Sequence, residues 1–254
     1  MLPRDGLTTS LREANKPALV AFVTAGFPNP DGFLNLLAEV CEAADAVEIG
    51  VPFTDPMADG VTIQRSSQAA LAQGVSLRWI FDQLAVRDSE LGAPILLMSY
   101  LNPLLAFGYD ALAARAAEVG VSGFIVPDLP YEESAPLRAA LDVQGLALVQ
   151  LVTPATPPDR LGALCRNSQG FVYAVTRTGI TGRATALPAD AADYLAGVSA
   201  ASDLPVCAGF GVRDRAQVEE IGKHADGVIV GSALIEALER GESPAAFLAG
   251  LRPA

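Results

Sequence analysis

Residues 46–72 read AVEIGVPFTDPMADGVTIQRSSQAALA. The short apolar run Ala46–Ile49 is followed by a loop rich in Pro and Gly. Apolar residues then recur over 62–72 at the three- and four-residue spacing of an amphipathic helix. This stretch predicts one strand followed by one helix. Only Glu48 breaks the apolar run, as expected for a parallel strand that is covered on both faces.

The same strand-then-helix unit recurs along the chain. The strand-type runs are Ala18–Thr24, Ala46–Ile49, Pro94–Met98, Gly123–Val126, Ala147–Leu151, Phe171–Val175, Pro205–Ala208 and Gly227–Val230. The helical segments are Asp31–Glu42, Thr62–Ala72, Tyr109–Val119, Glu132–Asp142, Pro158–Arg166, Ala189–Ser199, Asp214–Ile221 and Ala233–Arg240. These repeated units predict an α/β fold, a single (β/α)8 TIM barrel over residues 1–254 with a short N-terminal helical extension. An open doubly wound sheet is the rival, but residues 25–30 after the first run lack its Gly-rich fingerprint.

Composition limits the classes of protein that fit. The chain has 254 residues, of which 51% are hydrophobic, and a net charge of −12, which argues against a nucleic-acid or anionic-membrane surface. An anionic substrate must therefore be held locally. The start of the chain has no signal-peptide core, and the longest apolar stretch, 91–107, is broken by polar residues and prolines. Cys41, Cys165 and Cys207 are widely spaced and suggest reduced, buried thiols in a cytoplasm.

Two carboxylates are candidates for the chemistry. In a barrel, reactive groups gather at the carboxyl ends of the strands, where Glu48 falls, and in the loops that follow, where Asp59 falls. Alone, Glu48 also fits a salt-bridged residue, and Asp59 an ordinary turn. Together around a long loop they favour a catalytic interpretation, because two carboxyls in different settings can divide acid and base work.

The scarcity of other reactive groups strengthens this interpretation. The two lysines, Lys16 and Lys223, and the one histidine, His224, precede strands and so fall at the opposite end of a barrel. A Schiff-base lysine, a histidine general base and a histidine-ligated metal are therefore not expected at the active face. Carboxylates and tyrosines remain for proton transfer.

A phosphate site and a lid are also predicted. Gly209-Phe210-Gly211 follows the seventh run, and Gly231-Ser232 follows the eighth and opens a helix. In barrels these two loops commonly hold a phosphate through backbone N–H groups, although each alone also fits a tight turn. The long polar loop 176–186 after the sixth run is either filler or a lid, and its place above the inferred phosphate favours a lid.

The residues together resemble a known family. The segment 48–64 closely resembles the signature of the tryptophan synthase α subunit. Further matches cover the whole chain: Phe22-Val23-Thr24-Ala25-Gly26, Met98-Ser99-Tyr100-Leu101-Asn102-Pro103, Val126-Pro127-Asp128-Leu129-Pro130 with Glu132-Glu133-Ser134, Tyr173 with 177–182, and Gly209-Phe210-Gly211. Met57 and Val61 depart from the family pattern, where leucine and proline are common.

The resemblance implies a single barrel that cleaves indole-3-glycerol phosphate to indole and glyceraldehyde 3-phosphate without a cofactor of its own. Glu48 matches the catalytic glutamate, which protonates the ring carbon and takes the proton of the adjacent glycerol hydroxyl. Asp59 matches the aspartate that binds the indole N–H, and Tyr173 the tyrosine near the glutamate. Apolar neighbours should raise the pKa of Glu48, whereas Asp59, on a polar loop, should stay ionised.

The remaining site residues follow from the same resemblance. Phe22, Tyr100 and Asp128 match positions that line the indole pocket. Thr181 matches the lid residue that meets Asp59 on closure. The phosphate cradle is matched by Gly182, Gly211, Gly231 and Ser232.

The resemblance also implies a partner, the pyridoxal-phosphate-dependent β subunit, in a heterotetramer of two α and two β subunits. Asp55, Pro56 and Gly179 match positions near that interface. A stand-alone lyase that releases free indole shares every catalytic residue and stays open as the alternative. A non-catalytic scaffold is disfavoured by the intact Glu48 and Asp59, and an indole-3-glycerol phosphate synthase would need catalytic lysines.

Overall fold

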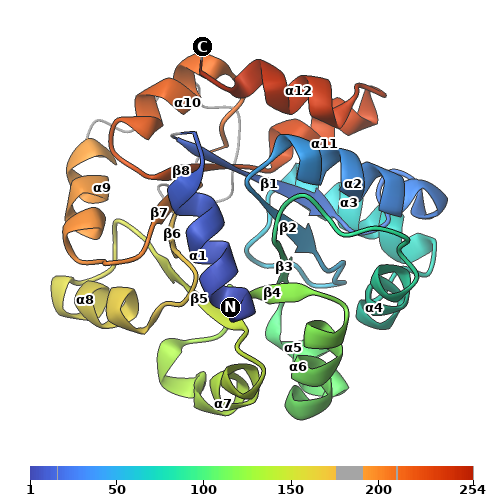
Figure 1. Ribbon diagram of the computed structural model, residues 1–254, viewed down its shortest axis with the longest axis horizontal. Helices are drawn as coiled ribbons and strands as arrows, with labels where there is room; N and C mark the ends of the chain where they lie inside the picture. Colours follow the sequence, from blue (N-terminus) through green and yellow to red (C-terminus); the bar gives the residue numbers. More distant parts are fainter. Residues whose placement is uncertain (16, 176–190, 210, 254) are drawn as a thin grey trace.

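The fold is a closed barrel. The computed structural model describes residues 1–15, 17–175, 191–209 and 211–253. Its parallel strands pair in chain order, and β8 closes the ring on β1 (Figure 1). The strands are β1 (Ala18–Thr24), β2 (Ala46–Gly50), β3 (Ile95–Met98), β4 (Val121–Ile125), β5 (Ala147–Val152), β6 (Val172–Val175), β7 (Val206–Gly209) and β8 (Gly227–Val230). The predicted TIM barrel is confirmed, and the strand ends differ only slightly from those predicted.

The strands are apolar on both faces because alternate residues pack into two different cores. One set fills the inside of the barrel: Ala18, Val20, Ala46, Leu96, Ile125, Ala147, Val149, Phe171, Cys207 and Ile229. The residues between them, such as Leu19, Val47 and Leu97, pack outward against the helices. This explains why the strand runs show no polar alternation.

The amino end of the barrel is closed by helix α1 (Pro3–Glu13), which lies across the ring of strands (Figure 1). Its Leu7 and Leu11 are fully buried and join the inner core. The Thr8 hydroxyl donates to the carbonyl oxygen of Gly170 (2.9 Å). The Ser10 hydroxyl donates to the backbone carbonyl oxygen of Asp45 (2.7 Å). Both acceptors lie just before strands, so α1 seals the end opposite the strand carboxyl termini.

The other helices surround the barrel (Figure 1). They are α2 (Phe33–Ala43), α3 (Val61–Ala72), α4 (Leu77–Ala85), α5 (Leu101–Phe107), α6 (Tyr109–Glu118), α7 (Ala135–Val143), α8 (Pro158–Asn167), α9 (Ala191–Ala200), α10 (Arg215–Gly222), α11 (Ser232–Glu239) and α12 (Pro244–Leu251), with the short 3₁₀ turns η1 (Pro30–Gly32) and η2 (Tyr131–Glu133). The part of the chain described here contains no helix that is both long and apolar enough to cross a membrane.

The helix predictions differ from the structure in two ways. The segments predicted from Asp31 and Glu132 begin in η1 and η2, and their α-helices start later. Helices α4, α5 and α12 were not predicted. For α5 the reason is Pro103, which lies in the first helical turn, where its missing N–H costs no hydrogen bond. The start of the helix predicted from Ala189 lies outside the described residues.

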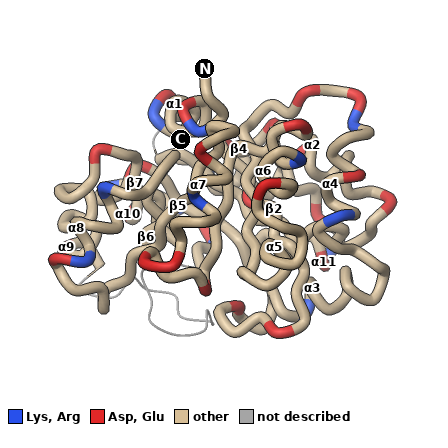
Figure 2. Tube along the Cα trace, turned by 90° about the horizontal axis from the view of Figure 1, so that it is seen from below, with Lys and Arg blue, Asp and Glu red and all other residues tan. Residues whose placement is uncertain are grey.

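Charged side chains are distributed over the surface. In the side view of Figure 2, acidic and basic positions are scattered over the helices and loops, and the acidic ones are more frequent. Cys41, Cys165 and Cys207 are all buried, as predicted. In a barrel, reactive groups gather at the carboxyl ends of the strands, which is where the sequence predicts the candidate catalytic residues.

Candidate active site

A cavity of about 200 Å³ opens at the carboxyl ends of the strands. It brings together seven of the predicted residues: Phe22, Glu48, Asp59, Tyr173, Gly211, Gly231 and Ser232. Gly209, from the predicted phosphate motif, also lines it, as do Ala58, Gly60, Ile63, Met98 and Pro127, which lie in motifs that resemble the family but had no role assigned. Sequence reasoning did not single out Leu151, Val175 and Ile229. Several of these are the last inward-facing residues of their strands, so barrel topology would have identified them once the strand register was known.

Glu48 is the ionisable residue of β2 that lines this cavity. It lies in register with Phe22 on β1 and Leu96 on β3, on the inward face of β2. Its side chain is fully buried, and neither carboxyl oxygen has a hydrogen-bond partner among the residues that the structure describes. Burial raises the pKa of Glu48 from 4.5 to about 8. A carboxyl in this setting holds its proton at neutral pH and faces a cavity, which suits proton donation.

The buried carboxyl should reduce stability as the pH rises. An unfolded chain releases the Glu48 proton near 4.5, whereas the folded chain keeps it to about 8. Between these values the folded state binds more protons, so the free energy of unfolding falls with rising pH. Glu48→Gln should remove this loss and be more stable than the parent at a pH of about 8, by on the order of a few kcal/mol. Urea unfolding of the parent and of Glu48→Gln, from a pH of about 5 to about 8, measures the difference in their free energies of unfolding. An equal difference at every pH would contradict the raised pKa.

Tyr173, on β6, lines the same cavity as Glu48. Its pKa lies well above 10, first because of burial and then because of the Glu48 charge. A Cβ at Gly209 on the neighbouring β7 would lie 2.9 Å from the Tyr173 hydroxyl oxygen, so a glycine at this position leaves the ring its space. Tyr173 therefore stays neutral at neutral pH and forms part of the cavity wall with Glu48.

Asp59 enters the cavity from the loop after β2. The loop is held by its own backbone hydrogen bonds, and the Gln64 side chain donates to the Asp59 carbonyl oxygen (2.9 Å). Burial raises the pKa of Asp59 to about 6, an effect that a hydrogen bond from Tyr100 partly offsets. The loop after β2 turns the Asp59 carboxyl inward, so its pKa is higher than its place on a polar loop suggested. Asp59 is still ionised at neutral pH.

Tyr100 contacts the loop after β2 at two places. Its ring stacks on Phe53 at 5.2 Å between centroids, and its hydroxyl oxygen accepts a hydrogen bond from the Ala58 N–H (2.8 Å). Burial, followed by the Asp59 charge, raises the pKa of Tyr100 to about 12. Tyr100 lines a smaller pocket of about 20 Å³ that shares Asp59 and Phe22 with the main cavity. It therefore contacts the site through Asp59 and the loop backbone.

Tyr100→Phe tests this arrangement. Loss of the hydroxyl should raise the pKa of Asp59 above about 6, because the Tyr100 hydrogen bond lowers it. It should also lower the free energy of unfolding by about 2 kcal/mol, because the hydroxyl makes two hydrogen bonds with a usual net value of about 1 kcal/mol each. Carbon-13 NMR titration of the side-chain carboxyls and urea unfolding measure the two effects. An unchanged Asp59 pKa would show that Tyr100 only packs.

Asp128 has a different place from the one expected. It accepts a hydrogen bond from the Leu101 N–H (2.9 Å) and so fixes the start of α5, directly after Tyr100. It lines a second cavity, of about 290 Å³, that lies beside the main one and shares Pro127 and Leu151 with it. Asp128 thus supports Tyr100 from outside the main cavity wall.

The far end of the cavity carries the features of an anion site. Gly211 has a φ of 69°, a conformation that favours glycine, and Gly231 and Ser232 begin α11. The first N–H groups of a helix have no intrahelical acceptor and favour an anion. The ring of Phe22 packs beside Gly231, between this end and Glu48.

The remaining predicted positions lie outside the cavity or outside the described residues. Asp55 is exposed and Pro56 half-buried on the loop after β2, next to Met57, which is 80% exposed. The predicted lid 176–186, with Gly179, Thr181 and Gly182, lies outside the described residues.

Comparison with known proteins agrees with this geometry. The sequence model of one family, described as tryptophan synthase alpha chain, matches residues 8–249. The chain is 43% identical over 250 residues to the tryptophan synthase alpha chain of Solidesulfovibrio magneticus, covering 97% of this chain and 98% of the relative. The corresponding chain of Desulfovibrio desulfuricans is 44% identical over 249 residues, covering 96% and 98%.

Solved structures give the same result. A chain of Mycobacterium tuberculosis tryptophan synthase superposes with a TM-score of 0.88 at 36% identity, covering 100% of this chain and 99% of that one. The tryptophan synthase subunit alpha of Legionella pneumophila gives a TM-score of 0.86 at 33% identity, covering 99% and 97%.

Proposed function

Since this chain belongs to the tryptophan synthase alpha chain family, we propose that the cavity built around Glu48 and Asp59 is where it cleaves indole-3-glycerol phosphate. The enzyme is a lyase of tryptophan biosynthesis that catalyses the aldol-cleavage half-reaction and forms indole and glyceraldehyde 3-phosphate. We assign the whole of residues 1–254 to one catalytic domain. The observation that carries the site assignment is the fully buried, unpartnered Glu48 carboxyl, with its pKa of about 8, at the cavity wall.

Glu48 moves one proton in the reaction. In its protonated form it gives the proton to the indole ring carbon that bears the glycerol side chain. The resulting carboxylate takes the proton of the adjacent glycerol hydroxyl. The bond between ring carbon and side chain then breaks, its electron pair returns to the ring, and the hydroxyl carbon becomes the aldehyde carbon. The net change is the transfer of one proton from oxygen to carbon.

Asp59 stabilises the charge that this protonation creates. When the ring carbon is protonated, positive charge develops on the indole nitrogen. A carboxylate hydrogen-bonded to that N–H lowers the energy of the cation, and more strongly in a site shielded from water. Asp59 enters the same cavity as Glu48 and has a pKa of about 6, so it is charged at neutral pH.

The other residues hold the substrate. Phe22 and Tyr173 supply the aromatic walls for the indole ring, and Tyr100 and Asp128 act behind them through the Asp59 loop. Gly211, Gly231 and Ser232, with Gly182 of the lid, hold the phosphate, and Thr181 meets Asp59 when the lid closes.

The two carboxyls predict a bell-shaped pH profile for kcat/KM. Activity should fall below a pH of about 6, where Asp59 takes up a proton, and above about 8, where Glu48 loses the proton that it must donate. Initial rates of indole release across this range measure the profile. A rate that keeps rising above pH 8 would show that Glu48 acts first as a base.

We assign the chain a β-subunit partner, in a heterotetramer of two α and two β subunits in the cytoplasm. The chain needs no cofactor of its own in this assignment, and pyridoxal phosphate belongs to the β subunit, which receives the indole. Asp55 and Pro56, exposed and half-exposed on the loop that carries Asp59, together with Gly179, lie at the interface. A partner docked there acts directly on the position of Asp59.

Indole release from indole-3-glycerol phosphate, by the purified chain alone and with its β subunit, tests the function. Strong stimulation by β supports the subunit assignment and the role of the loop after β2. High activity that β does not change favours a stand-alone lyase that releases free indole. No indole in either reaction overturns the proposed site.

A further inference from the structure

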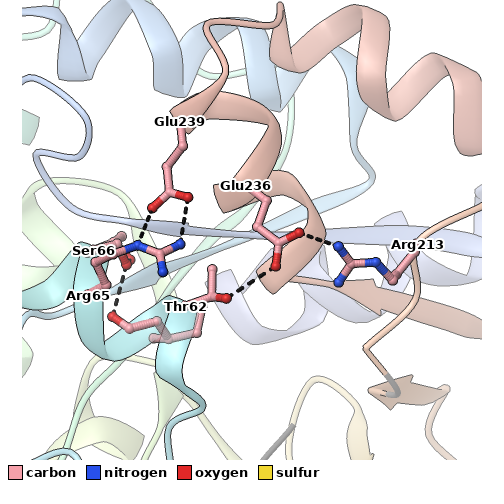
Figure 3. A network of polar contacts seen from close by, with 8 residues as sticks. Thr62, Arg65, Ser66, Arg213, Glu236 and Glu239 are labelled. Carbon is pink, nitrogen blue, oxygen red and sulfur yellow. Dashed lines mark hydrogen bonds and ion pairs between the residues drawn. The ribbon is translucent and has the colours of Figure 1, made fainter. Parts of the chain in front are cut away.

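Glu236 connects three segments that the barrel brings to one side of the site (Figure 3). It lies on α11, one helical turn after Ser232. Its Oε1 accepts a hydrogen bond from the Thr62 hydroxyl (3.2 Å), and its Oε2 pairs with the guanidinium of Arg213. One carboxylate thus holds α3 with one oxygen and the loop after β7 with the other.

Both partners of Glu236 sit next to groups of the proposed site. Thr62 lies in the first turn of α3, three residues after Asp59, and Gln64 of the same turn holds the Asp59 backbone. Arg213 follows Gly211 by two residues, and its own N–H donates to the Gln217 side chain (2.7 Å) at the start of α10. The Glu236 carboxylate therefore joins the segment that carries Asp59 to the segment that carries Gly211.

A second ion pair shows what Glu236 adds. Arg65 on α3 makes two hydrogen bonds to Glu239 on α11, at 2.7 and 2.6 Å (Figure 3). This pair already fastens α3 to α11, one turn farther from the cavity. Glu236, unlike Glu239, extends the connection to Arg213 and so to the proposed phosphate end of the site.

The charge state of Glu236 suits a fixed connection. Burial opposes ionisation, but the hydrogen bond and charge of Arg213, together with the Thr62 hydroxyl, outweigh it and lower the pKa of Glu236. Its side chain is 25% exposed and that of Arg213 is 40% exposed. Pairs with this exposure contribute little to global stability, so removing the Glu236 charge should leave the fold intact.

We propose that Glu236 is a positioning residue that couples the phosphate end of the site to the Asp59 end. A phosphate held by Gly211, Gly231 and Ser232 orders the start of α11 and the loop after β7. Glu236 passes this order to Thr62, and thereby to Asp59. The inference rests on the proposed roles of Asp59 and the phosphate cradle. It predicts that phosphate and indole favour each other's binding, although different residues hold them.

The test compares the affinity of the full chain for indole without and with saturating inorganic phosphate, by isothermal titration calorimetry. Phosphate should tighten indole binding by about fivefold, which corresponds to about 1 kcal/mol of coupling. Glu236→Gln and Thr62→Val should each abolish this effect while indole alone binds as before. Glu239→Gln is the matched control, because it breaks an arginine pair on the same two helices and should keep the coupling.

Steady-state kinetics provides a second measurement. Glu236→Gln should raise KM for indole-3-glycerol phosphate by about fivefold, because this substrate carries both groups and loses their mutual tightening. It should also lower kcat, because Asp59 matters most when charge develops in the transition state. Glu239→Gln should change neither constant. A loss of stability alone would affect both variants alike.

Each result decides the inference. Coupling that is lost in Glu236→Gln and kept in Glu239→Gln supports it. Coupling that survives in Glu236→Gln, disappears equally in both variants or is absent from the parent protein overturns it. A parent protein that releases indole from indole-3-glycerol phosphate but shows no coupling overturns the inference alone. A parent that releases no indole overturns the proposed site as well.

Discussion

Glu48→Gln is expected to lower the rate of indole release by about a thousandfold or more. The amide has nearly the same size as the carboxyl but can neither give the proton to the ring carbon nor take the proton from the glycerol hydroxyl. Because both Glu48 oxygens lack hydrogen-bond partners, the substitution breaks no existing contact. The loss should therefore appear in kcat with the fold unchanged.

The measurement is single-turnover formation of indole, with far-ultraviolet circular dichroism and urea unfolding as checks of the fold. Glu239→Gln is a suitable control, because it makes the same chemical change on the outer side of α11. A Glu48→Gln variant that kept a tenth of the parent rate would remove Glu48 from the mechanism. The buried carboxyl would then need another explanation.

Asp59→Asn is expected to lower kcat/KM by about a hundredfold to a thousandfold, the usual cost of removing one charge-stabilising group. Asparagine can still hydrogen-bond the indole N–H and Tyr100, but it carries no negative charge to oppose the indole cation. The variant should also lose the fall in activity below a pH of about 6, because the group responsible for it is gone.

The pH profile of kcat/KM for the parent and for Asp59→Asn measures both effects. Asp110→Asn, an exposed carboxylate on α6, is the control and should leave the profile unchanged. A persistent acidic limb in Asp59→Asn would assign that limb to another group. An unchanged rate at neutral pH would show that the Asp59 charge does not act on the transition state.

The barrel was predictable because each strand carries its own local signal. Apolar runs such as Ala18–Thr24 and Gly227–Val230 appear in the structure with the same bounds. Helix α5 was not predictable in this way, because Pro103 reads as a helix breaker unless the position of the first turn is known. Short helices with a proline at the start depend on the packing around them.

The site was predictable in its residues but only partly in its environment. Glu48 lines the cavity, as its position near the carboxyl end of a strand predicted, and its apolar neighbours correctly predicted a raised pKa. The inward turn of Asp59 depends on Tyr100 and Phe53, whose stacking is a tertiary contact with no local signature. The Glu236 connection joins half-buried residues 174 positions apart on two helices, and sequence patterns carry no information on such pairing.

The two ends of the chain share one side of the barrel. Helix α1 covers its amino end, and near the other terminus Arg252 hydrogen-bonds Asp45 and the Ala43 carbonyl oxygen just before β2. The cavity opens at the opposite end. A tether attached to either terminus would therefore leave the mouth of the cavity facing solution, so the enzyme can be immobilised on a support or fused to a carrier without screening its catalytic face.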